Sequence, residues 1–572
     1  MVPNRSITYL CLYVFLYVCL RVREIISKHK NNIYISIKLA GKQRQPDKPE
    51  LVWHSVEEKP WEPRQFPFTG NPGLQGDAAA IQSDKPCDFL ELILSDALME
   101  VIVEQTNIYA EKSIAAMTVT PSNRLHKWQP VTLPELKQFF GLCFITGIIV
   151  KPTLDDYWTQ DEVYETPYFS KVMTRNRFQC ILRHLHYTDR EPPGNDKMFK
   201  IRGVLEMMLS RFKELYQPSE NIAIDEGTLG FRGRLSFKIF NPLKPTRFGV
   251  KSFILACSGT GYCFSMQPYC GTYSSLIDTV TYLLGDLANH GYHLYMDNYY
   301  NSVEMCEMLL SKGTHVCGTI RACRGTPDAI QQASLKTMEK GGKISLHTED
   351  ILVLAWRDNK IVRMVTTFHP DTMQNVQGWR KRVGQVMITK PQSVIEYNGS
   401  MNGVDRLDQN LSYYPFTRKT HKWTNKFMLY MFQICMYNSF VLYSLKHPEG
   451  RYSTMRSFMD SVIKAWTTSY FVPIGPQIPT GPEMPRGPRP RRAPRMSDPQ
   501  TRLSPFRAEK HVPIRLKPNA KKQEPTRKCR VCTANKVRHE TRYQCRICHV
   551  PLCRNICFKR YHTELNYGQL DD

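Results

Sequence analysis

Acidic residues are in short supply in this 572-residue chain. It has 52 Asp and Glu against 77 Lys and Arg, which gives a formal net charge of +25 at pH 7. Such a surplus raises the local concentration of polyanions, of which nucleic acid is the commonest. The deficit of negative charge therefore favours nucleic acid as a partner over a membrane surface, or over a charge that serves only solubility.

A hydrophobic run long enough to span a bilayer comfortably is also missing. The apolar stretch at 7–20 is shorter than the roughly 20 residues that a spanning helix needs. The residues after it offer no small-residue cleavage site for a signal peptide. The second apolar segment, 422–447, is apolar nearly all round, so a transmembrane helix is the alternative there. Gln433, Asn438 and Ser439 inside it favour a buried core helix. We expect no membrane association.

Closely spaced cysteines are absent from most of the chain. Of the 18 cysteines, six fall between Cys529 and Cys557, two lie near the N-terminus and ten are scattered singly. Scattered single cysteines suit a reducing compartment, where thiols stay buried and inert. Only the terminal cluster requires a separate explanation.

The residue pattern changes along the chain from helical to strand-like. Residues up to the Pro- and Gly-rich stretch 64–77 show no coherent pattern, so ordered structure is expected to begin after it. From about 86 to 215 the pattern is helical, with a capping box at Thr132–Glu135. From about 219 short strands surround one helical segment, 274–291, which is typical of a mixed α/β domain.

Two apolar strands in this region each end at an aspartate. "NIAID" ends at Asp225, beside Glu226, and "YHLYMD" ends at Asp297. Asn301, with Glu304 three residues on, is expected to cap the next helix. If the strands are neighbours, their carboxylates lie side by side and suit Mg²⁺, and two such ions about 4 Å apart can support phosphodiester cleavage. For either acid alone, a strand that simply reaches solvent explains the pattern equally well.

A third acid is needed, because two metal ions require a bridging carboxylate and separate outer ligands. "GVDRLDQN" supplies Asp405 and Asp408, which share a face if the segment is helical. A single Asp is far more often a surface or capping residue. Two strand-end acids with this pair, in a basic chain, indicate a metal site that acts on phosphodiesters.

The C-terminal part combines a basic linker with metal-ligand spacing. Residues 471–528 hold 13 prolines and a surplus of ten positive charges, densest at 489–495, and read as a semi-extended spacer. Paired C-x-x-C motifs then predict zinc binding. The expected ligands are Cys529, Cys532, Cys545, Cys548, Cys553, Cys557 and His562, with His539 or His549 as the eighth of two interleaved sites. A structural module, a DNA-contacting module and a ubiquitin-ligase or histone-reader module remain alternatives.

Together these motifs resemble the piggyBac transposases. The likeness rests on "IDEGTLGFRGR", "YMDNYYNSVEMCEMLL", "NGVDRLDQN" and the Cys/His tail, and runs from about residue 64 to 567. The resemblance implies an α/β, ribonuclease-H-like catalytic domain with an insertion, flanked by a helical DNA-binding and dimerisation domain, plus a small C-terminal zinc-binding domain. The implied boundaries are a disordered leader at 1–85, the helical domain at 86–217 and 413–470, the catalytic domain at 218–324 and 391–412, the insertion at 325–390, the linker at 471–528 and the zinc domain at 529–567.

The resemblance also implies a reaction and its residues. Asp225, Asp297 and Asp405 would be the catalytic acids that hold two Mg²⁺ ions, with Asp408 as an accessory acid. The reaction would be metal-dependent cleavage of double-stranded DNA at terminal inverted repeats, hairpin formation and joining into TTAA targets, by a homodimer in the nucleus. Because relatives adopted by a host can keep the acids, a DNA-binding protein without catalytic activity is the alternative.

Overall fold

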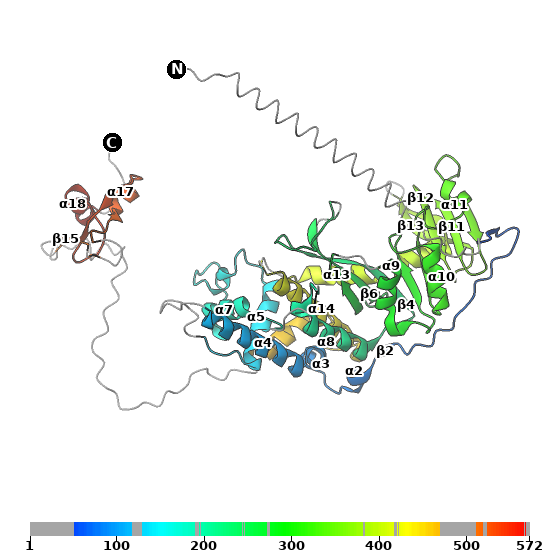
Figure 1. Ribbon diagram of the computed structural model, residues 1–572, viewed down its shortest axis with the longest axis horizontal. Helices are drawn as coiled ribbons and strands as arrows, with labels where there is room; N and C mark the ends of the chain where they lie inside the picture. Colours follow the sequence, from blue (N-terminus) through cyan, green and yellow to red (C-terminus); the bar gives the residue numbers. More distant parts are fainter. Residues whose placement is uncertain are drawn as a thin grey trace, which may run out of the picture. The chain divides into compact units, whose positions relative to one another are not determined.

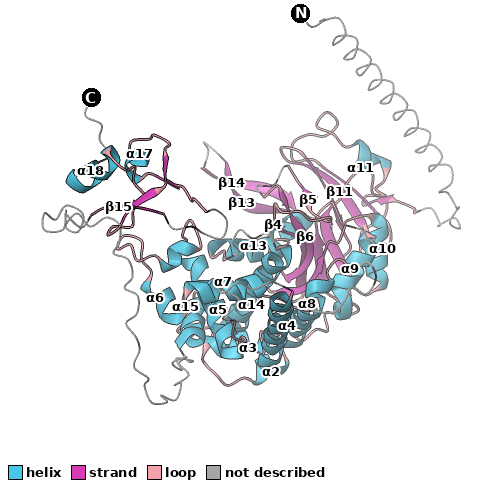
Figure 2. Cartoon of the chain, turned by 60° about the vertical axis from the view of Figure 1, so that its left-hand side comes forward, coloured by secondary structure: helices cyan, strands magenta, loops and turns pink. Residues whose placement is uncertain are grey.

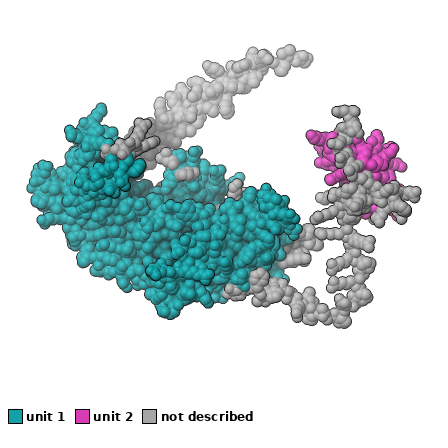
Figure 3. Space-filling view, turned by 180° about the vertical axis from the view of Figure 1, so that it is seen from behind, with its two compact units in different colours: residues 1–472 teal, residues 473–572 magenta. Residues whose placement is uncertain are grey.

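The computed structural model describes residues 51–116, 128–188, 194, 196–242, 244, 246–271, 275–380, 384–416, 420, 422–468, 511–516, 518, 523–564 and 567. The chain forms two compact units, residues 1–472 and 473–572 (Figure 3). The apolar stretch 7–20 and the basic peptide 489–495 lie outside the described residues.

A ten-stranded mixed sheet forms one side of the first unit, at the right in Figure 1. The strand order is β1-β10-β11-β12-β9-β8-β4-β6-β5, and β7 also pairs with β6. The strands are β1 (His54–Ser55), β4 (Asn221–Gly230), β5 (Ile239–Phe240), β6 (Phe248–Cys257), β7 (Cys263–Pro268), β8 (His293–Met296), β9 (His315–Thr319), β10 (Lys343–His347), β11 (Leu352–Arg357) and β12 (Ile361–Thr366).

The middle of this sheet has a ribonuclease-H-like strand order. β7 pairs antiparallel with β6 and β6 with β4, whereas β4–β8 and β8–β9 are parallel. Parallel neighbours need a crossover, and α9 (Leu276–Leu284) and α10 (Val303–Ser311) supply it before β8 and β9. The predicted α/β, ribonuclease-H-like fold is therefore confirmed.

Most of the segment predicted as an insertion extends the same sheet. β10, β11 and β12 continue it beyond β9 by antiparallel pairing. The rest of the segment forms a separate two-stranded ribbon of β13 (Met373–Arg380) and β14 (Gly384–Pro391) (Figure 2).

Ordered structure begins earlier than predicted. β1 pairs with β10 at the edge of the sheet, although it precedes the Pro- and Gly-rich stretch. The indole Nε1 of Trp61 donates a hydrogen bond of 2.8 Å to the backbone oxygen of His369. The expectation that order starts only after residue 77 is wrong, because these partners lie some 300 residues away in the sequence and leave no local pattern.

Helices gather beside the sheet (Figure 2). They include α2 (Gly76–Ala80), α3 (Pro86–Ile93), α4 (Asp96–Ala115), α5 (Leu133–Ile148), α6 (Pro167–Val172), α7 (Arg175–His184), α8 (Phe199–Leu215), α11 (Asp328–Gln332), α12 (Gln392–Ser400), α13 (Gly403–Tyr413), α14 (Trp423–Lys446) and α15 (Met455–Thr468). Two short 3₁₀ turns, η2 (Asp155–Trp158) and η3 (Gly285–Leu287), and the pair β2 (Gly73–Leu74) and β3 (Tyr216–Gln217) complete the unit.

The two predicted helix caps have different outcomes. The Thr132 hydroxyl accepts from the backbone N–H of Glu135, as the capping box requires. The cap expected at Asn301 is wrong, because Ser302 caps α10 instead. Asn301 is buried, and its amide donates to the backbone oxygens of Met296 and Thr319 at 2.9 and 3.0 Å. It therefore fastens β8 to β9.

The long apolar segment is a buried core helix, α14, as predicted. Among the described helices, none combines the length and apolar character needed to cross a membrane. The Asn438 side chain accepts from the backbone N–H of Cys263 and donates to its oxygen, both at 2.9 Å. Gln433 donates to the backbone oxygens of Leu411 and Tyr414. The polar residues inside α14 thus tie it to β7 and to the end of α13.

The second unit is small and has little apolar core. Its elements are β15 (Pro513–Arg515), β16 (Arg527–Lys528), α17 (Arg530–Ala534), β17 (Glu540–Thr541), β18 (Tyr543–Cys545) and α18 (Ile556–Thr563). Antiparallel pairs join β15 to β18 and β16 to β17. Cysteines share the buried cluster with Val531, Val550, Leu552 and Tyr561. A core of this size needs a metal or a disulfide to be stable.

We predict that Asn438→Ala destabilises the first unit by about 3 kcal/mol, because both backbone groups of Cys263 would stay buried without a partner. Ser444→Ala, which removes a bond to Phe440 within the same helix, should cost less than about 1 kcal/mol. Guanidinium unfolding followed by circular dichroism measures both. Equal losses in the two variants would contradict the assigned role of Asn438.

Candidate functional site

Asp225 lies inside β4 and not at its end, contrary to the prediction. β4 continues to Gly230 because β6 stays paired with it up to Gly249. On its other side, the parallel partner β8 ends at Met296, opposite Ile224. Asp225 is therefore the first residue of β4 beyond the end of its parallel neighbour.

Asp297 directly follows β8, so it takes the register position next to Asp225. Side chains alternate along a strand, so these two acids share a face with Ala223 and Tyr295, which pack in one cluster with Val394 of α12. The structure thus brings the two carboxylates together on the face that α12 covers.

The environment of these two acids opposes their negative charge. Burial raises the pKa of Asp225 to about 6, and the nearby charges of Asp297, Glu226 and Asp405 add to the rise, against a backbone N–H bond from Glu226. Burial also raises the pKa of Asp297, while the backbone N–H of Tyr299, at 2.8 Å, lowers it. A bound cation would offset this repulsion.

α13 adds the other two acids. It packs against β4 and β6, and a Cβ at Gly403 would lie 3.0 Å from the backbone oxygen of Cys257, so a larger residue would press the helix away from that strand. Asp405 is exposed in the first turn of α13, and Asp408 is half-buried one turn later. Burial raises the pKa of Asp408 to about 6, and the charge of Asp405 adds to this against that of Lys244.

The donor set fits a hard divalent cation. All four groups are carboxylates, the ligands that Mg²⁺ and Ca²⁺ prefer. Among the described residues these carboxylates do not form a group with every ligand atom within 4.8 Å of the others. Mg²⁺ keeps several of its waters when bound, so Asp225, Asp297 and Asp405 could hold it partly through water.

Glu226 has a different environment, because neighbouring strand residues point to opposite faces. Its carboxylate pairs with the Lys251 ammonium at 2.5 Å. That ammonium also lies over the rings of Phe253 and Tyr299, at 4.5 and 4.4 Å from their centroids. Sequence reasoning missed Lys251, because its partner Glu226 lies on another strand.

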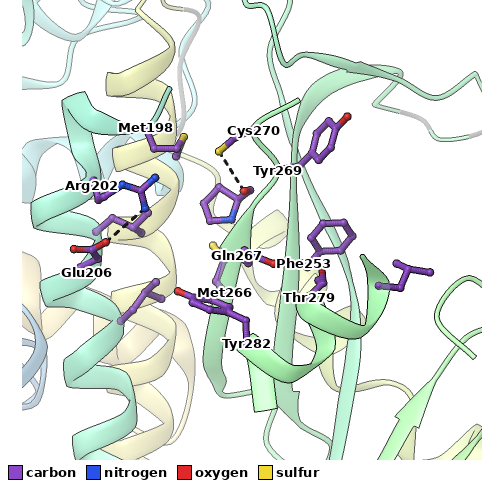
Figure 4. A pocket seen from close by; sticks show the side chains of 14 residues that line it. Met198, Arg202, Glu206, Phe253, Met266, Gln267, Tyr269, Cys270, Thr279 and Tyr282 are labelled. Atoms are coloured by element: carbon purple, nitrogen blue, oxygen red, sulfur yellow. Dashed lines mark hydrogen bonds and ion pairs between the residues drawn. The ribbon is translucent and has the colours of Figure 1, made fainter. Parts of the chain in front are cut away.

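A pocket of about 290 Å³ lies apart from the acids, lined by residues of α8, β7 and α9 (Figure 4). Met198, Phe253 and Tyr282 line it, with the ion pair of Arg202 and Glu206 at one side. None of the four aspartates belongs to this lining. The acids therefore lie outside this pocket.

The second unit holds two sets of four metal-ligand side chains, and in each set all ligand atoms lie within 4.8 Å of one another. The two sets alternate along the chain, which confirms the predicted interleaved arrangement. One set is Cys529, Cys532, Cys553 and Cys557, and the other is His511, Cys545, Cys548 and His562.

The eighth residue is His511, not His539 or His549 as predicted. β15 pairs with β18, with Pro513 opposite Cys545, and this pairing brings His511 to the second set. His539 lies outside both sets, with Nδ1 3.2 Å from the Cys553 sulfur. His549 occupies a left-handed turn with φ of 54°. The domain boundary expected at Cys529 leaves out this strand.

Comparisons with known proteins agree with both units. A family model described as Transposase IS4 matches residues 85–440, and one described as DDE_Tnp_1-like zinc finger matches 509–563. The chain is similar to human PiggyBac transposable element-derived protein 3, with 26% identity over 377 residues, 63% of this chain and 61% of that protein. It is also similar to human PiggyBac transposable element-derived protein 2, with 24% identity over 383 residues, 64% of this chain and 62% of that protein.

The matched part thus spans about three fifths of these two relatives. Among solved structures, the chain is similar to the piggyBac transposase in a cryo-EM structure of its synaptic complex with hairpin DNA. The TM-score is 0.60 at 24% identity, over 70% of this chain and 83% of that chain. This likeness shows a shared fold.

We predict that the chain binds two zinc ions and that His511→Ala binds one, because one of its two ligand sets loses a member. His539→Ala and His549→Ala should keep two. Zinc per chain, measured by atomic emission after desalting, tests this. Loss of an ion from the His539 or His549 variant, with His511→Ala unchanged, would contradict the assignment.

Neighbouring carboxylates in β4 should affect stability with opposite signs. The folded-state pKa of Asp225 is raised, so its favourable contribution exists at low pH and is lost as the pH rises through about 6. At neutral pH without added divalent cation, Asp225→Asn should therefore raise the free energy of unfolding, by at most about 3 kcal/mol. The gain should vanish below pH 3.8.

Glu226→Gln is the matched variant for this experiment. It leaves the buried ammonium of Lys251 without its carboxylate and should lower the free energy of unfolding. Guanidinium titrations across the pH range measure both variants. A shift of both in the same direction at neutral pH would refute this description of the two faces.

Proposed function

From the premise that the chain belongs to the piggyBac family of transposases, whose Transposase IS4 family model matches residues 85–440, we propose that it cuts DNA at transposon ends and joins the ends to a target. The reaction class is phosphodiester cleavage followed by strand transfer. Water would be the first nucleophile, and a freed 3′-hydroxyl would be the next.

We assign the chemistry to the four aspartates. Asp225, Asp297 and Asp405 would hold two Mg²⁺ ions, and Asp408, one turn along the same helix, would support Asp405. Bound Mg²⁺ would lower the pKa of the attacking hydroxyl and stabilise the leaving oxygen. The chain would contribute carboxylates whose negative charge only a bound cation compensates, and that cation would in turn attract the phosphate.

The observation that carries this proposal is the register of β4 and β8. Parallel pairing stops at Ile224 and Met296, and an aspartate follows at once on each strand. An acid that only reached solvent, or that capped a helix, would not need to follow the end of the pairing on both strands. The raised pKa of Asp225, caused by burial and by the other acids, supports the same interpretation.

The substrate and assembly follow from the same family. Double-stranded DNA with terminal inverted repeats and a TTAA target is the proposed substrate, and a homodimer in the nucleus the proposed working form. The net charge of +25 supports a polyanionic partner. The zinc unit would bind the repeats, since it carries several Lys and Arg between its ligands.

A second candidate is a host-adopted DNA-binding protein without catalysis. The names of the two human relatives, both transposable element-derived proteins, favour it. In such a protein the zinc unit would bind DNA, and the four aspartates would have no function. Replacing all four would then change nothing in cells, whereas zinc removal would abolish DNA binding.

We predict that the purified full-length chain, given Mg²⁺ and a duplex with the inverted repeats that flank its gene, nicks that duplex. Asp297→Asn should lower the rate by roughly a hundredfold or more, because one carboxylate of the proposed cation site becomes neutral. Asp286→Asn, which changes an exposed acid of η3, is the matched control. If neither the intact chain nor Asp297→Asn cuts the duplex, catalysis is rejected and the DNA-binding candidate remains.

A further inference from the structure

One tryptophan is placed unlike the others. Seven of the eight are buried or half-buried, whereas Trp379 is 77% exposed. Tryptophan is costly to leave in water, because a large apolar ring gains much from burial. A single exposed ring of this size therefore indicates a surface that has a use outside the fold.

Trp379 lies on the separate ribbon of β13 and β14. Side chains alternate between the two faces of the ribbon, and Trp379 is on the face that is exposed to solvent. Across the ribbon, Trp379 is opposite Gln385, and Gln377 is opposite Met387, which is 63% exposed. Two pairs nearer the stem, on the same face, the Thr389 hydroxyl donates to the side-chain oxygen of Asn375 at 2.7 Å. The exposed face therefore carries the indole ring of Trp379 and the thioether of Met387, surrounded by side-chain amides and one hydroxyl.

The ribbon does not need Trp379 to hold its shape. On the opposite face Ile388 covers Gly378, where an added Cβ would lie 2.5 Å from Ile388 Cδ1. The stem is fastened by two bonds of 3.0 Å, from Gln392 N–H to the backbone oxygen of Thr372 and from the Thr372 hydroxyl to the Gln392 side chain. Truncating Trp379 should therefore leave the ribbon folded.

The ribbon continues directly into α12, the helix that covers the face with Asp225 and Asp297. β14 runs into α12, which begins at Gln392. Tyr397 of α12 feels the charges of Asp297 and Asp225, which add to the effect of burial in raising its pKa to about 12. Trp379 stands six pairs from the stem, a reach of roughly 20 Å at the rise of a strand. It can therefore touch DNA at nucleotides away from the bond that the acids would cut.

The positive charge of the ribbon indicates which kind of partner binds its exposed face. Residues 373–391 contain four Lys or Arg and no Asp or Glu. A second protein surface could cover an apolar ring, but an acid-free ribbon beside a phosphodiester-cleaving site suits a polyanion. Aromatic rings bind nucleic acid by stacking on bases, whatever the base.

We propose that the exposed face of the β13–β14 ribbon, centred on Trp379, binds a nucleobase of DNA that has left its stack. This inference rests on the proposed function, because it assumes that DNA lies at the acids. Trp379 would stack on the base, and the amides of Gln377 and Gln385 would offer hydrogen bonds to its edge. The site would favour DNA with unpaired bases over a fully paired duplex.

Two probes of equal charge test this with the full-length chain. One is a DNA hairpin with 2-aminopurine in its loop, and the other is the fully paired flush duplex of the same length. Ca²⁺ replaces Mg²⁺ so that cutting does not interfere. The intact chain should bind the looped probe more tightly and change its 2-aminopurine fluorescence as the base stacks.

Trp379→Ala should weaken binding of the looped probe by roughly tenfold and abolish the fluorescence change, with less than about a twofold effect on the flush duplex. Trp379→Phe keeps an aromatic face and should restore much of both. Tyr164→Ala removes an aromatic ring that is 67% exposed elsewhere on the first unit and is the matched control.

Three results would overturn the proposal. The first is equal binding of the looped probe by Trp379→Ala and by the intact chain. The second is an equal loss of affinity for both probes. The third is dissociation of an oligomer by Trp379→Ala in sedimentation, which would make this face a contact between copies. Cleavage assays separate the two ideas. A chain that cuts nothing but keeps the Trp379-dependent signal rejects catalysis alone, and a chain that cuts without that signal rejects the base site alone.

Discussion

The parallel pairing of β4 with β8 is the constraint on which the candidate site depends. It stops one residue before Asp225 and Asp297, so neither acid has a strand partner on the side where the two meet. β6 continues to pair with β4 beyond that level and keeps the backbone of Asp225 extended. The two carboxylates are therefore held by a rigid sheet, and a rigid support is what a site needs if its ligands are to keep their places against mutual repulsion.

The remaining acids depend on helix packing that is equally specific. Gly403 lets the start of α13 approach the backbone of β6, and Asn438 and Gln433 bind α14 to β7 and to the end of α13. Each of these contacts uses either a buried polar side chain or a glycine inside the core. An apolar side chain in the same place would pack without fixing one orientation. Their effect is to fix the level of α13 against the sheet, and with it the positions of Asp405 and Asp408.

Local pattern predicted the elements well, and pairing between distant segments accounts for what it missed. The end of β8 just before Asp297, the helical spacing of Asp405 and Asp408, and the C-x-x-C motifs are all visible within a few residues. His511 joins its ligand set only because β15 pairs with β18, and Asn301 acts as a fastener because β8 and β9 run side by side. The continuation of β4 past Asp225 and the merging of residues 343–366 into the main sheet likewise follow from partners that no single stretch of sequence reveals.

Two features of the first unit lower the stability of the protein in the absence of bound partners. Burial and repulsion raise the pKa of Asp225 and of Asp408, so their ionised forms are unfavourable at neutral pH. Trp379 is exposed to solvent, whereas the other seven tryptophans are buried or half-buried. Costs of this kind are typical of residues that serve binding or chemistry. A protein that only bound DNA through its zinc unit would gain stability from an amide at position 225 and from a polar residue at 379. α12 joins the ribbon that carries Trp379 to α13, which carries Asp408. Under the proposed function both costs would serve one operation, in which DNA is held open at the ribbon while its backbone lies at the acids.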